Sequence, residues 1–227
     1  MLYHWHREIE NLKAEILKLG ILVEEQIQKA ITALDKQDLE LAKEVIRSDK
    51  RIDEFEIHIE EECLKILALY QPVARELRFV VTVLKMNNDL ERMGDLAANI
   101  ARHAKFLSKQ GKIDLIAEFA LISTKVQAMV RKVLESLVNT DMYQAREVIS
   151  ADDEIDRLTN QLLKKTIKAT EQNCHYVKEY FSIRSISKNL ERIADSATNI
   201  AEDVIYLCSG EIVRHQEEFS GDDRTEE

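Results

Sequence analysis

The chain has 227 residues, a length that fits one large domain or two small ones. It contains only 5 glycines and 1 proline, too few for the many tight turns of an all-β fold. With 45% hydrophobic and 33% charged residues, the composition suits long helices around a core and excludes a disordered chain. The net charge of −10 argues against nucleic acid as a partner.

Helical periodicity predicts six long helices in chain order. The first follows an apolar stripe from Ile9 to Leu34, with steps of three or four residues. The second covers about 38–70, with Asp38 as its N-cap, and the third begins at Pro72, in the first turn, and buries Leu77. The pattern breaks at residues 110–112 and resumes in segments of about 114–139, 141–172 and 176–207.

The two halves of the chain repeat one pattern. The segment LERMGDLAANIA at 90–101 matches LERIADSATNIA at 190–201 in eight of twelve positions, at an offset of 100. Upstream, AKEVI at 42–46 matches AREVI at 145–149, at an offset of 103. We therefore predict an all-α fold of two tandem antiparallel three-helix bundles, residues 1–110 and 111–213, followed by an acidic flexible tail at 214–227.

Cellular location is indicated by two features of the sequence. The longest stretch without a charge runs from Ile66 to Ala74, far short of the roughly 20 residues that a membrane-spanning helix needs. The cysteines Cys63, Cys174 and Cys208 are odd in number and widely spaced, which favours reduced thiols over disulfides or a zinc site. We therefore expect a cytoplasmic protein with no transmembrane segment.

Acidic residues interrupt the apolar stripe at matching positions in the two halves. Asp49 lies on the expected buried seam of the second helix, and Asp53 follows one turn later on the same face. Glu91 and Asp95 form a similar pair on the third helix, and the second half reproduces both pairs. The candidate site therefore consists of eight carboxylates: Asp49, Asp53, Glu91, Asp95, Asp152, Asp156, Glu191 and Asp195.

These acids favour a metal site. Carboxylates that converge across two helices raise one another's pKa values unless positive charge is supplied, and a metal ion supplies it. Oxygen-only ligands suit Mg, Ca, Mn or Fe, and four acids per bundle fit two or more bridged ions better than one. The alternative is purely structural, because Arg92, Arg192, Arg78 and Arg184 on the same helices could neutralise the acids by salt bridges alone.

The sequence contains no motif that indicates catalysis. It lacks the glycine-rich loops GxGxxG and GxxxxGK[ST], and none of its 6 histidines follows a glutamate by three residues, as in ferritin-like di-iron bundles. No nucleophile or substrate-orienting loop is evident. We therefore predict that the protein is not an enzyme, and rank a metal-dependent hydrolase as the least favoured alternative.

Several motifs together resemble the PhoU family. They are DKRID at 49–53, DDEID at 152–156, QPVARELR at 71–78 and the two LERxxDxAxNIA blocks, and the resemblance extends from about His4 to Val213. It implies two three-helix bundles whose E(D)xxxD motifs bind multinuclear iron or zinc clusters, so that by position the eight acids are metal ligands. The second half departs from the family pattern, because residues 177–184 lack the Gln-Pro-Val-Ala start of the first.

The resemblance also implies a function. Members of this family are negative regulators of phosphate uptake and of phosphate-starvation signalling. They act as cytoplasmic adaptors between a phosphate ABC transporter and a sensor histidine kinase, associate peripherally with the inner membrane through these partners, and form homodimers. The alternative function is that of a purely structural helical adaptor, with salt-bridged acids and no functional metal.

Overall fold

The computed structural model describes residues 2–110 and 116–211, and these form six long helices and one short 3-10 turn without any strand. This confirms the predicted all-α fold. The helices are α1 (Leu2–Asp35), α2 (Leu39–Tyr70), α3 (Ala74–Leu107), α4 (Ile116–Asn139), α5 (Met142–Gln172) and α6 (Val177–Ser209), with the 3-10 turn η1 (Cys174–Tyr176) before α6.

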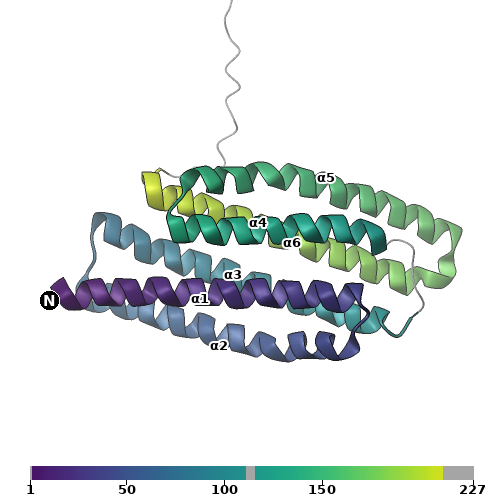
Figure 1. Ribbon diagram of the computed structural model, residues 1–227, viewed down its shortest axis with the longest axis horizontal. Helices are drawn as coiled ribbons and strands as arrows, with labels where there is room; N and C mark the ends of the chain where they lie inside the picture. Colours follow the sequence, from purple (N-terminus) through teal and green to yellow (C-terminus); the bar gives the residue numbers. More distant parts are fainter. Residues whose placement is uncertain (1, 111–115, 212–227) are drawn as a thin grey trace, which may run out of the picture.

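The six helices form two three-helix bundles that lie side by side (Figure 1). Helices α1, α2 and α3 make the first bundle, and α4, α5 and α6 make the second. The bundles pack through α3 against α6 and through α1 against α4. The α2–α3 and α5–α6 connections consequently lie at opposite ends of the molecule (Figure 1). The predicted break at 110–112 lies mostly, and the predicted tail at 214–227 entirely, outside the described residues.

Helix boundaries follow from local side-chain chemistry. The Asp38 carboxylate accepts hydrogen bonds from the backbone N–H groups of the second and third residues after it, which confirms the predicted N-cap of α2. Asp141 caps α5 in the same way. At the C-terminal end of α6, Gly210 adopts φ 78°, a left-handed conformation that glycine reaches without strain.

The core extends along both bundles and is densest around α3 and α6. Each of these two helices faces its own bundle and the other bundle at once, so apolar residues on several of their sides are buried. The predicted stripe on α1 is also buried, including Leu12, Ile16, Leu19, Val23 and Ile27. Each fully buried Leu, Ile or Val contributes about 1.5–3 kcal/mol, so this shared core is what holds the bundles together.

Two expectations for the third helix were wrong. It begins at Ala74 rather than at Pro72, and Val73 occupies the N-cap position in extended conformation. Leu77, expected in the core, is 41% exposed. Pro72 belongs to the connection, between the left-handed Gln71 and the extended Val73, and the first turn of α3 lies at an end of the first bundle, which leaves Leu77 partly uncovered (Figure 1).

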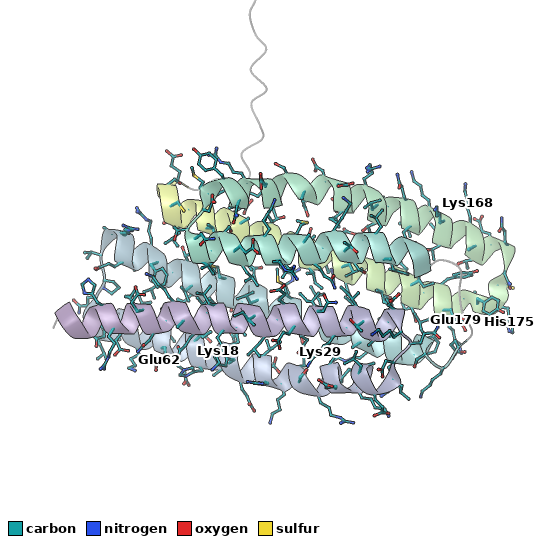
Figure 2. The ribbon with its side chains drawn as sticks, viewed as in Figure 1. Lys18, Lys29, Glu62, Lys168, His175 and Glu179 are labelled. Carbon is teal, nitrogen blue, oxygen red and sulfur yellow. The ribbon has the colours of Figure 1, made fainter. Side chains whose placement is uncertain are left out.

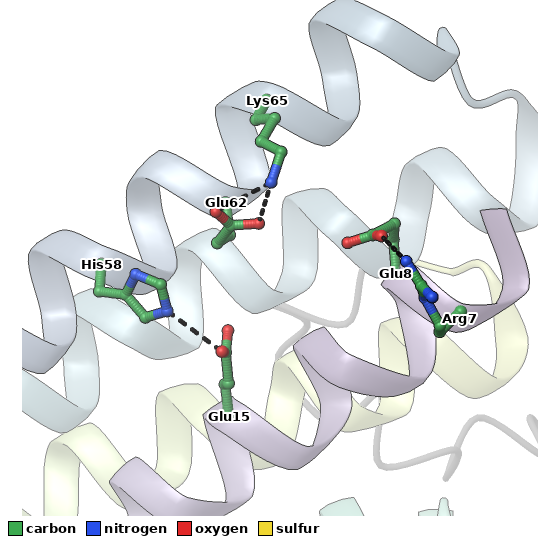
Figure 3. Close-up of polar contacts among 6 residues, drawn as sticks. All are labelled: Arg7, Glu8, Glu15, His58, Glu62 and Lys65. Atoms are coloured by element: carbon green, nitrogen blue, oxygen red, sulfur yellow. Dashed lines mark hydrogen bonds and ion pairs between the residues drawn. The ribbon is translucent and has the colours of Figure 1, made fainter. Parts of the chain in front are cut away.

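Polar contacts supplement the apolar packing on the surface and between the bundles. On the surface, His58 Nε2 lies 3.1 Å from Glu15 Oε1 and joins α2 to α1, and Lys65 pairs with Glu62 along α2 (Figure 3). Such exposed pairs contribute at most about 1 kcal/mol each. Between the bundles, Asn199 Nδ2 donates to Asp89 Oδ1 at 3.2 Å.

Among the helices of the described part of the chain, none combines the length and the apolar character needed to cross a membrane.

Candidate functional site

The four acids predicted in the first bundle lie on α2 and α3 and act on one another electrostatically. Asp49 is buried, with 7% exposure, whereas Asp53 and Asp95 are exposed and Glu91 is half-buried. Burial is the main cause that raises the pKa of Glu91, and the charges of Asp95 and Asp53 raise it further. The helices therefore bring this predicted group together.

Gln26 on α1, a residue that the sequence analysis missed, holds Asp49 in place. Its Nε2 donates to Asp49 Oδ1 at 2.8 Å and to the backbone oxygen of Gly94 at 3.1 Å, so one buried amide links all three helices of the first bundle. Burial raises the pKa of Asp49, and the hydrogen bond from Gln26 opposes that rise. Arg102 Nη2 adds a cation 3.9 Å from Asp49 Oδ2.

The second bundle also brings its four acids together, but Asp152 Oδ1 accepts no hydrogen bond like the one that holds the buried acid of the first bundle. Burial, followed by the charges of Asp195 and Asp156, raises the pKa of Asp152 to about 6. Asp152 Oδ1 is buried and has no hydrogen-bond partner. The pKa of Asp195 is also raised, first by burial and then by Glu191.

The repeat explains this difference between the bundles. At the offsets of the repeat, Met129 occupies the position of Gln26, and Glu202 occupies the position of Arg102. A thioether cannot donate a hydrogen bond, and a carboxylate adds negative charge where the first bundle has a guanidinium. Two other cations partly replace the missing donor and guanidinium. Lys188 pairs with Glu191, and Arg92 of the first bundle lowers the pKa of Asp195.

The predicted ligands fit a cation in their chemistry. All eight are carboxylates, which are ligands of hard and intermediate cations, and burial followed by the charges of neighbouring acids raises the pKa values of Asp49, Glu91, Asp152 and Asp195. Within the described part of the chain, however, no group of three or more His, Cys, Asp or Glu side chains is arranged to hold a metal ion. The acids of each bundle are neighbours without forming a coordination shell, and metal binding stays a prediction.

Sequence reasoning identified some of the compensating cations and missed others. Arg92, one of the four arginines suggested, acts on Asp195, but it does so across the two bundles. Arg102 and Lys188 were missed. Lys188 precedes Glu191 by three residues on α6, and Arg102 on α3 reaches Asp49 on α2. Gln26 had a detectable signal, because it lies three residues after Val23 and four before Ala30, on the buried side of α1.

Comparison with known proteins bears on both bundles. The PhoU domain model matches residues 16–104 and again residues 119–204, so each match falls within one bundle. The phosphate-specific transport system accessory protein PhoU homolog of Aquifex aeolicus is 40% identical over 92% of this chain and 95% of its own length. A protein of the same name from Clostridium acetobutylicum is 33% identical over 91% of this chain and 94% of its own.

Solved structures agree with these matches. The crystal structure of PhoU from Pseudomonas aeruginosa superposes with a TM-score of 0.89 at 35% identity, covering 91% of this chain and 100% of that one. The phosphate transport system regulatory protein PhoU from Streptococcus pneumoniae superposes with a TM-score of 0.85 at 30% identity, covering 92% of this chain and 99% of that one. With the same domain found in both halves and the same fold in solved relatives, the chain belongs to the PhoU family.

Proposed function

We propose that this protein is a negative regulator of phosphate uptake and of phosphate-starvation signalling. The observation that supports this most strongly is the length of the similarity, because relatives named as accessory proteins of phosphate-specific transport match more than nine-tenths of the chain. The protein acts in the cytoplasm as an adaptor between a phosphate ABC transporter and a sensor histidine kinase. It is a homodimer and reaches the inner membrane through these partners. This role requires no catalytic turnover.

The proposal includes metal ions, iron or zinc, as part of the adaptor. Asp49, Asp53, Glu91 and Asp95 would hold them in the first bundle, and the second bundle would use the group Asp152, Asp156, Glu191 and Asp195. A bound cation neutralises mutual repulsion between carboxylates and fixes the positions of the helices that bear them. The raised pKa values and the unpartnered Asp152 Oδ1 support this use of the acids.

A second candidate is a purely structural adaptor, in which basic side chains satisfy the acids. The pairing of Lys188 with Glu191 and the approach of Arg102 to Asp49 favour it. The two candidates differ in what a chelator does. If metal supports the adaptor, removing it weakens partner binding, whereas a salt-bridged adaptor binds equally well with and without chelator.

The regulatory role is tested by complementation in a bacterium that lacks its own regulator of this family and carries a phosphate-starvation reporter. We expect the wild-type chain to restore repression in high phosphate. The double variant Asp152→Asn with Glu191→Gln tests the acids, and Glu40→Gln with Glu44→Gln, which removes the same charge from two exposed acids on α2, is its control. Failure of the wild-type chain to restore repression, while it is folded and expressed, contradicts the proposed function.

Physical partners are tested in the same strain. We expect the tagged chain to recover the transporter and the kinase from detergent-solubilised membranes, and sedimentation to give the mass of a dimer. Recovery of neither partner in high or low phosphate would contradict the adaptor role, and a monomer at micromolar concentrations would contradict the homodimer.

A further inference from the structure

The connection between α5 and α6 forms an exposed apolar end of the second bundle. We call residues 164–181 the α5–α6 tip. Ile167, Tyr176, Val177 and Phe181 within it are large apolar side chains exposed to solvent, and Phe181 is 68% exposed. Every residue from 171 to 178 is exposed. Clustered exposed apolar side chains of this size typically mark a surface that another partner covers.

The same tip is basic, although the chain as a whole has a net charge of −10. It contains four lysines, Lys164, Lys165, Lys168 and Lys178, against two glutamates. All four lysines are exposed, whereas Glu179, in the first turn of α6, is buried. Figure 2 shows Lys168, His175 and Glu179 together at this end of the molecule.

Comparison with the first bundle shows that this charge is not a consequence of the duplicated fold. The corresponding α2–α3 connection exposes Leu64, Leu69 and Val73, so it is equally apolar. It has Glu61 and Glu62 where the second bundle has Lys164 and Lys165. Residues 61–78 contain three basic and three acidic side chains, and the α2–α3 end is therefore neutral.

The shape of the molecule separates the basic tip from the acidic groups of the second bundle. The tip lies at an end of the long axis (Figure 1). The nearest of those acids along the helices are Asp156, 8 residues before Lys164, and Glu191, 10 residues after Phe181, which at 1.5 Å per residue places them about 12 Å and about 15 Å from the tip. The Debye length at physiological ionic strength is about 8 Å, so a negatively charged surface that touches the tip is largely screened from those acids.

We propose that the α5–α6 tip docks directly on an anionic lipid bilayer. Phe181, Val177 and Tyr176 enter the interface between headgroups and acyl chains, where apolar and aromatic side chains are stabilised. The exposed lysines contact the anionic headgroups, and their long stems allow the ammonium groups to remain in water while the neighbouring apolar side chains insert. Direct lipid contact goes beyond the proposed function, in which the protein reaches the membrane through protein partners.

The test is co-sedimentation of the full-length chain with protein-free vesicles of phosphatidylcholine, with or without phosphatidylglycerol. We expect binding to the anionic vesicles that weakens as salt is raised, and little binding to the zwitterionic ones. Replacing Lys164 and Lys168 with Gln should weaken binding by about 25-fold, at about fivefold for each lysine. Phe181→Ser should weaken it by about tenfold, because an exposed aromatic side chain no longer inserts.

Matched controls come from the first bundle. Leu69 is 68% exposed, the same as Phe181, so Leu69→Ser removes a comparable apolar group at the other end of the molecule. Lys18→Gln with Lys65→Gln removes the same charge far from the tip (Lys18 is labelled in Figure 2). We expect both controls to bind anionic vesicles as the wild type does, and all variants to melt cooperatively near the wild-type Tm.

Three results would overturn the proposal. One is equal binding of the wild type to anionic and zwitterionic vesicles. Another is an equal loss of binding in the controls and the tip variants. The third is binding that occurs only when native membrane proteins are present in the vesicles, which would make the tip a protein-docking surface. Because protein-free vesicles contain neither transporter nor kinase, the first two results are independent of the proposed regulatory function, and the third leaves that function intact while it removes direct lipid binding.

Discussion

Gln26 Nε2 donates a hydrogen bond of 2.8 Å to Asp49 Oδ1, so an amide on α1 holds a buried carboxylate on α2. The same nitrogen lies 3.1 Å from the backbone oxygen of Gly94, which ties α3 to the pair. The second bundle lacks this link, because Met129 takes the equivalent position. The two bundles therefore have acids at the same positions, but only the first bundle has an amide on its first helix that donates a hydrogen bond to the buried one.

Replacing Gln26 with Met should make the first bundle resemble the second. The buried Asp49 carboxylate would lose its donor, and its pKa would rise further above its ordinary value. We expect the free energy of unfolding at pH 7 to fall by about 1–3 kcal/mol, measured by urea denaturation. Gln28→Met, at an exposed position two residues away on α1, should change it by less than about 0.5 kcal/mol. Equal stability of Gln26→Met and wild type would contradict this role.

The raised pKa of Asp152 predicts a pH dependence of stability in the chelator-treated protein. A carboxyl group with a pKa of about 6 in the folded chain and 3.8 unfolded binds protons more tightly when folded. Its stabilising contribution is therefore complete below about pH 4 and is lost as the pH rises to about 6. Asp152→Asn should remove this part of the slope and add roughly 1–2 kcal/mol at pH 7, a figure reduced for partial exposure to solvent.

The control for that measurement is Glu135→Gln, which removes an exposed acid on α4. Its unfolding free energy should follow the wild-type pH profile between pH 4 and 7. If the unfolding free energy of the wild type does not decline over this interval, or if that of Asp152→Asn declines equally, Asp152 does not titrate in the way its burial implies.

Gly94 allows the close approach of α2 and α3 in the first bundle. A Cβ atom added there would lie 3.0 Å from Ile52 Cδ1 and 3.1 Å from Ile52 Cγ2. We expect Gly94→Val to destabilise the protein by about 2 kcal/mol or more, since the added methyl groups overpack a buried contact. Gly94→Ala should cost less, because its helix propensity, better by about 1 kcal/mol, offsets part of the clash. Wild-type stability of Gly94→Val in urea would contradict this account.

The three cysteines should differ in reactivity. Cys63 is fully buried, and burial followed by the charge of Glu15 raises its pKa to about 12. Cys174 is exposed, and Cys208 is exposed with a raised pKa. A thiol reagent such as Ellman's should react readily with Cys174 and should modify Cys63 only after unfolding. In a variant with Ser at 174 and 208, rapid reaction of the folded chain would contradict the burial of Cys63.

Sequence alone was sufficient for the fold, because its signals are local or periodic. Asp38 caps α2 as expected, and the stripe from Leu12 to Ile27 is buried. The surroundings of the acids were harder to predict, since they depend on which side chains meet across helices. Nothing in the spacing of α1 states that Gln26 reaches Asp49, or that Arg92 of one bundle acts on Asp195 of the other.

The position of α3 shows a different limit. Proline is favourable in a first helical turn, and that preference predicted a start at Pro72. The helix begins two residues later, at Ala74, and its first turn leaves Leu77 exposed. Local preference could not show that the α2–α3 connection lies at an uncovered end of the molecule.

If the carboxylates of each bundle bind metal, as we propose, the purified chain contains it. We expect wild type and the control Glu40→Gln with Glu44→Gln to contain equal bound iron or zinc by elemental analysis. The variant Asp152→Asn with Glu191→Gln should lose the share held by the second bundle while remaining folded. Wild-type protein with no metal above background, or a variant that retains the full wild-type content, would contradict the claim.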